Sequence, residues 1–326
     1  TGSATVSAYD VTDVTGPITP NGPSVPVSLP TPGQTARLTF DGTVGQRISV
    51  NGSATLTGCW TLALLKPDGS TLASSFSCGS AIFIDPQTLP VAGTYTVLAD
   101  PNTSATGSAT VTAYDVTDVT GSITPSGSSV PVSLPTPGQT ARLTFNGTVG
   151  QRVSLNGSAT LTGCWTLAIL KPDGSTQAST FSCGSSIFIE PQTLAVAGTY
   201  TVLVDPNTSA TGSATVSLYN VVDTSGTLTI NAPAINVSLT TPGQISSLTF
   251  TGAASQQVTV RVAGSTFSCV TVTLKKPDGT NLTSTFSCGS TFNLATQTLP
   301  VAGTYTVIVD PNTASTGSLN LSVTNP

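Results

Sequence analysis

Apolar and polar residues alternate with a period of two along most of the chain. Ala36, Leu38 and Phe40 fall on one face of an extended backbone, and Trp60 and Leu62 repeat this pattern further along. Such alternation is typical of half-buried β-strands, and no stretch combines helical spacing with good helix formers. Within the first 115 residues, the pattern predicts strands at 25–29, 35–41, 46–50, 59–65, 81–85, 94–100 and 107–115.

Turn-forming segments separate these strands. PTPGQ, GTVGQ, KPDG and DPNTSATG are rich in Gly, Pro, Asn and Asp, which favour tight turns. Roughly eight short strands in each stretch of about 105 residues indicate an all-β fold. We expect an antiparallel β-sandwich of the jelly-roll or immunoglobulin-like kind, with a Greek-key barrel as the alternative.

The chain consists of internal repeats. The sequence TGSATVSAYDVTDVTG begins at Thr1, close copies begin at Thr106 and Thr211, and a shorter one begins at Thr316. Repetition at a fixed step of domain size predicts tandem copies of one fold. The three expected β-sandwich domains are 11–115, 116–220 and 221–326.

The first ten residues do not belong to any of these three domains. The strands at 94–100 and 107–115 are expected to form a hairpin that closes a domain, so Thr1–Asp10 has the sequence of the last strand of a preceding unit. Either the array continues upstream, which we favour, or this segment completes a neighbouring chain by strand addition. The absence of Met indicates a processed or partial product.

Each unit carries two cysteines, 19 residues apart, with Pro-Asp-Gly midway between them. In an antiparallel hairpin, the sequence numbers of two facing residues add up to the same value for every facing pair. Cys59 and Cys78 have the same sum as Asp68 and Gly69 at the turn. The cysteines therefore face each other across a loop of two or four residues, whereas Pro-Asp-Gly favours three. We expect either a four-residue loop or one further bulge to restore the pairing. The expected disulfides are Cys59–Cys78, Cys164–Cys183 and Cys269–Cys288.

The third unit indicates where the disulfide lies. Thr271, Thr273 and Lys275 share a face with Cys269, which predicts an outer face or a place where units meet. Zinc is a competing interpretation, but it needs four ligands and a unit offers two thiolates. We favour disulfides within a unit over cross-links between units or chains and over free thiols. Paired cysteines indicate an oxidising, extracellular compartment, and each closed loop should contribute about 3 kcal/mol.

Composition narrows the class of function. Histidine is absent, which removes the usual catalytic triads and the commonest general base and metal ligand. We therefore expect no enzyme and no cofactor. Only 7% of the residues are charged, the net charge is −5 and no basic run occurs, which argues against a nucleic-acid partner. No apolar run approaches the roughly 18 residues that span a membrane.

Paired carboxylates recur near the domain boundaries. Asp10 and Asp13 are repeated as Asp115 and Asp118, and such a pair could bind calcium together with backbone carbonyls. We favour instead a capped turn in a solvated linker.

Asn-x-Ser/Thr triplets are frequent, although they arise easily by chance in a chain so rich in Ser and Thr. Glycans on these side chains, or on exposed Ser and Thr, would help to keep a weakly charged chain in solution. The candidate asparagines are Asn51, Asn102, Asn146, Asn156, Asn207, Asn236, Asn281 and Asn320.

The few cations and tryptophans each have two interpretations. Trp60 and Trp165 could stack on sugars, but they alternate with core residues and are expected in the core. The cations could form a sparse anion site, but solubility and protection of strand edges explain them better. These cations are Lys66, Lys171, Lys275 and Lys276 beside the turns, and Arg37, Arg47, Arg142 and Arg152 on adjacent strands.

The stretches ARLTFDGTVGQRISV, TLALLKPDGSTLAS and QTLPVAGTYTVLADP resemble the bacterial pre-peptidase C-terminal domain. The matching elements are Phe40, Gly45 with Gln46, 64–69 and 92–97, and they recur in all three units. The resemblance implies a jelly-roll-like sandwich in a secreted or surface bacterial protein, with non-catalytic work such as spacing, attachment or polymer binding. The central cysteine hairpin is not part of that family's general pattern.

We therefore expect a secreted structural protein: a fibre, filament or surface stalk in which repeated units contact one another end to end. Near-identical units, short junctions and no chemistry that differs between copies favour this function. The alternative is an adhesive module that binds carbohydrate or collagen and is attached to a secreted enzyme, with repeated weak sites acting by avidity.

Overall fold

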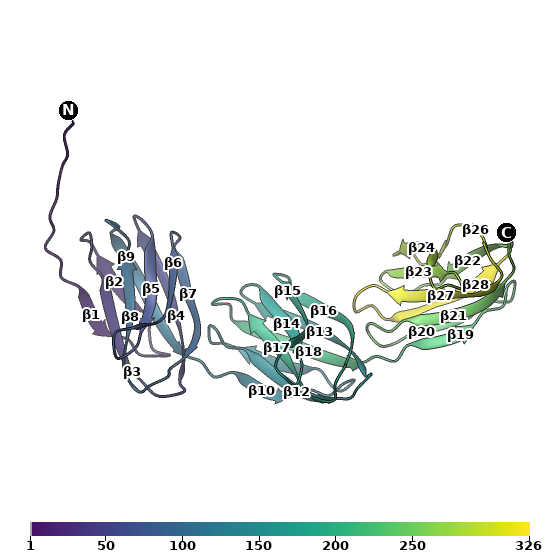
Figure 1. Ribbon diagram of the computed structural model, residues 1–326, viewed down its shortest axis with the longest axis horizontal. Coiled ribbons are helices and arrows are strands. Elements are labelled where there is room, and N and C mark those ends of the chain that lie inside the picture. Colours follow the sequence, from purple (N-terminus) through teal and green to yellow (C-terminus); the bar gives the residue numbers. More distant parts are fainter. Residues whose placement is uncertain (1) are drawn as a thin grey trace.

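The computed structural model describes residues 2–326 and shows three β-sandwich units in a row (Figure 1). We call them unit 1 (β1–β9), unit 2 (β10–β18) and unit 3 (β19–β28). Residues 2–10 extend away from unit 1 without strand structure (Figure 1), and Thr1 lies outside the described residues. Within residues 2–326, no helix has the length and apolar character that crossing a membrane requires.

Unit 1 consists of two sheets packed face to face, as alternating strands require. One sheet has the order β1-β3-β8-β5-β6, and the other has the order β2-β9-β4-β7. The strands are β1 (Val14–Pro17), β2 (Val25–Leu29), β3 (Ala36–Gly42), β4 (Arg47–Leu56), β5 (Trp60–Leu65), β6 (Thr71–Ser77), β7 (Ala81–Thr88), β8 (Gly93–Pro101) and β9 (Gly107–Asp115).

Unit 2 repeats both sheets, and unit 3 repeats them with one change, because two short strands replace the equivalent of β7. Unit 2 contains β10 (Val119–Ser122), β11 (Val130–Leu134), β12 (Ala141–Gly147), β13 (Arg152–Leu161), β14 (Trp165–Leu170), β15 (Thr176–Ser182), β16 (Ser186–Thr193), β17 (Gly198–Pro206) and β18 (Gly212–Asn220). Unit 3 contains β19 (Thr224–Thr227), β20 (Ile235–Leu239), β21 (Ser246–Gly252), β22 (Gln257–Ala263), β23 (Val270–Lys275), β24 (Asn281–Ser287), β25 (Phe292–Asn293), β26 (Gln297–Thr298), β27 (Gly303–Pro311) and β28 (Gly317–Thr324).

Each unit has its own hydrophobic core between its two sheets. Trp60 and Tyr95 are fully buried in unit 1, which confirms the prediction that the tryptophan belongs to the core. The Tyr95 ring stacks on Phe40 at 5.7 Å, and its hydroxyl donates a 2.8 Å hydrogen bond to the carbonyl of Val91. This bond satisfies the one polar atom that the ring carries into the core. The all-β sandwich expected from the alternation is confirmed.

Two details of the topology differ from the predictions. β8 and β9 do not form a hairpin, because β8 lies in one sheet and β9 in the other. Their connecting turn crosses between the sheets, and each strand pairs instead with strands distant in sequence. In addition, β1 pairs with β3 in parallel rather than antiparallel, because the chain between them first passes through β2 in the opposite sheet.

Candidate functional site

The β5–β6 hairpin and the disulfide at its open end recur in every unit. Cys59 bonds to Cys78, and the equivalent bonds join Cys164 to Cys183 and Cys269 to Cys288. The loop begins as a three-residue turn with Gly69 at φ +82°, as Pro-Asp-Gly favours. A bulge between Leu64 and Leu65 then shifts the register so that the two cysteines lie opposite each other.

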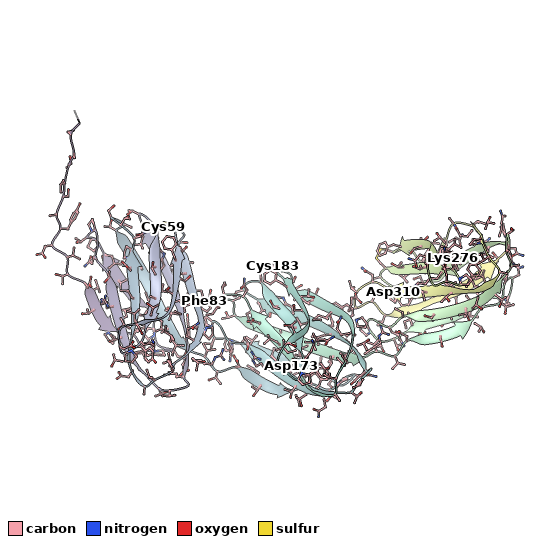
Figure 2. All side chains as sticks on the ribbon, viewed as in Figure 1. Cys59, Phe83, Asp173, Cys183, Lys276 and Asp310 are labelled. Carbon is pink, nitrogen blue, oxygen red and sulfur yellow. A yellow bond between two sulfur atoms is a disulfide. The ribbon has the colours of Figure 1, made fainter. Side chains whose placement is uncertain are left out.

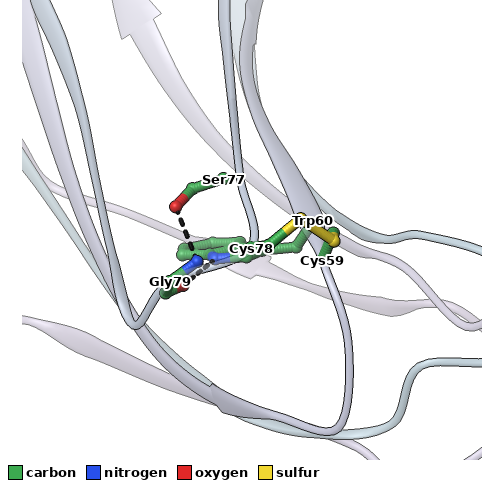
Figure 3. Close-up of a disulfide and its surroundings, with 5 residues drawn as sticks. All are labelled: Cys59, Trp60, Ser77, Cys78 and Gly79. Carbon is green, nitrogen blue, oxygen red and sulfur yellow. Dashed lines mark hydrogen bonds between the residues drawn. A yellow bond between two sulfur atoms is a disulfide. The ribbon is translucent and has the colours of Figure 1, made fainter.

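The disulfide covers the edge of the core rather than lying inside it. Cys78 is exposed and Cys59 is half-buried, while the adjacent Trp60 is buried. Figure 3 shows the indole nitrogen of Trp60 donating to the carbonyl of Gly79 at 3.3 Å, and the amide of Gly79 donating to Ser77 Oγ. The disulfide therefore fixes the end of the hairpin that also anchors the largest core side chain. Such bonds persist in an extracytoplasmic, oxidising compartment.

The contact between units 1 and 2, which we call the first junction, contains an ion pair. Arg47 on β4 contacts the carboxylate of Asp118 at 2.8 Å, and Arg142 approaches the same oxygen at 3.6 Å. Asp118 ends a linker of only three residues between β9 and β10. Val116 begins that linker, and it is buried and donates its amide proton to the carbonyl of Arg47. A linker held in this way restricts rotation of unit 2 relative to unit 1.

A loop of unit 2 completes the first junction. The hydroxyl of Ser49 in unit 1 donates a 2.8 Å hydrogen bond to the carbonyl of Pro137. Gly138, at φ +83°, lies so close to unit 1 that an added methyl group would come within 2.7 Å of Pro86 Cγ. Phe83 borders this contact on the side of unit 1 that faces unit 2 (Figure 2). Glycine is therefore required here by both conformation and space.

Units 2 and 3 meet in the same way, in what we call the second junction. Arg152 forms an ion pair with Asp223, and Ser154 donates a 2.7 Å hydrogen bond to the carbonyl of Pro242. Gly243 packs on Pro191, as Gly138 packs on Pro86. Asp310 lies on the side of unit 3 that faces unit 2 (Figure 2). The chain therefore contains two copies of one junction, made by equivalent residues.

Carboxylates at the first junction have shifted pKa values. Burial alone would raise the pKa of Asp118, but hydrogen bonds from Arg47 and from the backbone of Thr140 outweigh burial and lower it. Burial raises the pKa of Asp205, and the carboxylate of Asp85 in unit 1 adds to the increase. The first junction therefore stabilises the ionised form of Asp118, whereas it destabilises the ionised form of Asp205.

The second junction has the same electrostatic character. Burial raises the pKa of Asp310, and Asp223 raises it further. Burial also raises the pKa of Glu190, with a smaller contribution from Asp310.

The junctions account for several residues whose function the sequence left open. Arg47 and Arg152 join successive units, whereas the sequence favoured solubility and edge protection for them over a sparse anion site. Asp118, a candidate calcium ligand, is engaged by arginines, and Asp115 accepts a hydrogen bond from Gln46 at 2.9 Å. Asp10 lies in the extended segment. Among the described residues, no three His, Cys, Asp or Glu side chains gather as they would around a metal.

A further group of charged residues lies at the turn between β5 and β6 and at its equivalents. Asp68 accepts hydrogen bonds from the hydroxyl group and from the backbone amide of Ser70. Both bonds lower the pKa of Asp68, and the hydroxyl bond has the larger effect. Lys66 lies 4.0 Å from Asp68, and Lys276 lies 3.5 Å from Asp278. Exposed pairs of this kind contribute little to stability. They fit the expected solubility function of the lysines.

An exposed aromatic residue that was absent from the sequence-based predictions also recurs. Phe76 projects into solvent from the edge strand β6, and Phe181 and Phe286 occupy the equivalent positions. The recurrence of this phenylalanine every 105 residues can be read from the sequence. The outward direction of its side chain cannot, because period-two alternation does not by itself say which face of a strand is buried.

Two equivalent surface hollows, one in unit 1 and one in unit 2, are lined by serine, threonine and alanine. The one in unit 1, with a volume of about 320 Å³, lies between β4, β7 and β9 and has an equivalent of about 330 Å³ in unit 2. The candidate glycosylation sites lie on the surface as well. Six of the asparagines are exposed and two are half-buried, Asn51 and Asn156 being the half-buried ones.

No protein-family model and no curated protein matches the chain. Distant structural matches exist among β-sandwich domains. The pre-peptidase C-terminal domain of a Bacillus anthracis collagenase is 17% identical over 31% of this chain and 96% of that domain, with a TM-score of 0.25. The Aeromonas hydrophila lysozyme inhibitor PliG is 18% identical over 31% of this chain and 99% of the inhibitor, with a TM-score of 0.23.

The PBSX exported protein XepA is 12% identical over 62% of this chain and 88% of XepA, with a TM-score of 0.23. The expected resemblance to the pre-peptidase domain is thus met only by a distant structural match, and no sequence family is shown. Likenesses at this level do not bear on function.

Proposed function

We propose that this chain is a structural component of an extracellular fibre or surface stalk, in which disulfide-stapled β-sandwich units are held at fixed spacing and catalyse no reaction. The observation that carries the proposal is the repetition of the junction. The pairs Arg47–Asp118 and Arg152–Asp223 occupy equivalent places between successive units. Flexible linkers would serve separate binding modules well, whereas a spacer needs linkers that transmit orientation.

The chemistry of the surface agrees with a passive function. Catalysis needs a nucleophile or a proton donor positioned by neighbouring groups. Of the carboxylates with raised pKa values, Asp205 is half-buried and Asp310 is exposed, and both lie at junctions. The three disulfides would keep each unit closed outside the cell, where refolding is not assisted.

Electron microscopy of the secreted material from the source cells, under non-reducing conditions, tests this function. We expect long fibres or stalks with an axial repeat of one unit. Isolated short rods, or particles attached to a larger catalytic body, would contradict the proposal. The same preparation, tested against general hydrolase substrates with and without a chelator, would reveal any activity of the chain.

A second candidate function is adhesion to a polymer, and the repeated exposed phenylalanines favour it. Phe76, Phe181 and Phe286 would present one aromatic ring per unit. Weak binding at each ring would be multiplied by repetition. Titration of the chain with soluble glycans and collagen peptides, compared with a triple Phe→Ser variant, tests this function. Saturable binding that the variant loses would establish adhesion in place of pure spacing.

A further inference from the structure

Unit 1 carries the same upstream loop that units 2 and 3 use to contact the unit before them. The sequence PTPGQ at 30–34 is identical to that at 135–139, which contains Pro137 and Gly138 of the first junction. Asp13 corresponds in the same way to Asp118. We call Asp13 and residues 30–34 the upstream face of unit 1.

This face is already in the conformation that the junctions use. Gln34 donates a 2.8 Å hydrogen bond to the carbonyl of Thr12, and the amide of Thr35 donates to Asp13 at 3.0 Å. The equivalent bonds in unit 2 link Gln139 to Thr117 and Thr140 to Asp118. Unit 1 has therefore folded its half of a junction without a neighbour.

The groups that contact a neighbour in the junctions are open on this face. Among residues 2–326, an added methyl group on Gly33 would meet nothing within 4 Å, whereas one on Gly138 would collide with Pro86. The Asp13 side chain is 37% exposed and contacts Arg37, while that of Asp118 is 15% exposed and also contacts Arg47. The face thus lacks an arginine from outside, together with the serine and proline that accompany it.

The segment before unit 1 has the pattern of the strand that would bring these residues. Residues 1–16 differ from 106–121 at one position only. Val6 is 91% exposed, whereas its equivalent Val111 in β9 is fully buried. Val11 is 40% exposed, whereas Val116 of the first junction is 3% exposed. An alternating apolar strand left in water gains stability when it pairs in a sheet.

The opposite end of the molecule does not offer the matching surface. In unit 3, Gln257 replaces the arginine, Thr259 the serine and Thr296 the proline. The hydroxyl groups of Thr259 and Thr296 bond to each other at 2.8 Å, within their own unit. The adjacent Arg261 donates to Thr324 of the same unit. The end of unit 3 is therefore closed on itself, and a second copy of this chain cannot supply the missing arginine from the equivalent position.

We propose that the upstream face of unit 1 is a docking surface for the arginine-bearing end of another unit of the unit 1 and unit 2 kind, which takes residues 2–10 as its final strand. Charge complementarity with Asp13 and the buried counterparts of Val6 and Val11 identify this partner. Assembly along the row is directional, because units dock at the upstream face and not at the end of unit 3. The inference rests on the proposed structural function for its biological meaning, but its test does not.

A four-unit chain tests the proposal. A copy of residues 11–105 is placed directly before Thr1 of the full chain, so that residues 1–10 follow it as 106–115 follow the original. Hydrogen exchange of the amides at 3–9 is then compared with the three-unit chain. We expect exchange to slow by at least about 100-fold, as it does for strands inside a sheet. Unchanged exchange would overturn the assignment of the strand.

A matched control separates docking from strand pairing. In the control chain, only the added copy carries the unit 3 residues, that is Arg47→Gln, Ser49→Thr and Pro86→Thr. We expect the Asp13 carboxyl to titrate at lower pH in the four-unit chain than in the three-unit chain, and the control to return it toward the three-unit value. Equal titration in both four-unit chains would overturn the docking surface even if the strand forms.

The three-unit chain itself provides the remaining comparison. Sedimentation at increasing concentration should show a single monomer. Head-to-tail association that Asp13→Asn abolishes would overturn the proposal in favour of a second copy as the occupant. Failure in any of these measurements leaves the first and second junctions intact, so it can be told apart from failure of the proposed structural function.

Discussion

Arg47 of unit 1 and Asp118 of unit 2 form an ion pair 2.8 Å apart across the boundary between two separately folded domains. Because the linker contains only three residues, the pair fixes an orientation rather than merely tethering the units. The same relationship recurs 105 residues later, between Arg152 and Asp223. The proposed spacer function depends on that repetition.

Replacing Arg47 by Gln, the residue of unit 3, should weaken the first junction. A half-buried ion pair with a charged neighbour contributes about 0.5–1 kcal/mol. Trp60 and Trp165 make unfolding of units 1 and 2 visible by fluorescence, because unit 3 has no tryptophan. In a double-mutant cycle with Asp118→Asn we expect a coupling energy of that size. A coupling energy of zero would contradict the prediction. If, in addition, Arg47→Gln changed the stability no more than a Lys66→Gln control does, the ion pair would not hold the junction.

The junction carboxylates predict the dependence of stability on pH. The pKa values of Asp205 and Asp310 are raised by burial, so their ionised forms destabilise the folded state, and the penalty disappears as pH falls through these raised values. The thermal midpoint should therefore rise as the pH falls from neutrality through these raised pKa values, which lie above the ordinary 3.8.

Further acidification should reverse this trend. The pKa of Asp118 is lowered below the ordinary 3.8, so its stabilisation is complete above that value and is lost as pH falls through the lowered pKa. Asp205→Asn with Asp310→Asn should flatten the rise and leave the acid loss unchanged. Calorimetry across the pH range measures both limbs, and a monotonic profile in the parent chain would contradict the prediction.

A second pair of residues explains how the core changes between units. Gly52 lies against Trp60 across the sandwich, and an added methyl group would come within 2.5 Å of the indole ring. In unit 3, Val262 occupies the position of Gly52 and Val270 occupies the position of Trp60, so volume moves from one sheet to the other. Gly52→Val should destabilise unit 1 by about 1–3 kcal/mol through overpacking.

The compensating change provides the control for this prediction. Gly52→Val combined with Trp60→Val recreates the unit 3 pair and should recover most of the loss. Urea denaturation measures both variants. A double variant that is as unstable as the sum of the single variants would show that the two positions are independent.

The disulfides predict a mechanical property of each unit. Cys59 and Cys78 are 19 residues apart in sequence and 3.9 Å apart in space. At about 3.5 Å per extended residue, reduction should lengthen each unfolding event by about 60 Å in single-molecule pulling. Equal contour lengths with and without reductant would contradict a closed loop. In a Cys59→Ser, Cys78→Ser variant, only the unfolding event of unit 1 should match that of the reduced chain, and unit 1 should lose about 3 kcal/mol.

Much of the fold follows from the sequence, because local signals determine it. Alternation predicts the strands, and the spacing of Cys59 and Cys78 about Asp68 and Gly69 predicts a facing pair. The sequence left open whether a four-residue loop or a bulge brings the pair into register, and the structure has the bulge. The prediction that β8 and β9 form a closing hairpin was wrong. The two strands are consecutive and apolar and polar residues alternate in both, and nothing in such a pattern tells which sheet a strand joins. That choice depends on long-range partners, such as Tyr95 facing Phe40.

The candidate site was much harder to predict. Arg47 looks like any exposed strand residue, since its partner lies 71 residues away in another domain. A comparison between units would have been informative, because Arg, Ser and Pro of the contact are all replaced together in unit 3. Such joint replacement at one end of the array is a signal of an interface rather than of scattered surface residues.

Residual dipolar couplings measured for all three units in one weakly aligned sample test the central claim most directly. If the junctions fix the units relative to one another, a single alignment tensor fits the couplings of units 1, 2 and 3 together. A variant with Arg47→Gln and Arg152→Gln should then require separate tensors, while a Lys66→Gln, Lys171→Gln control should not. Separate tensors in the unaltered chain would contradict the account, because units that turn freely cannot set a fixed spacing.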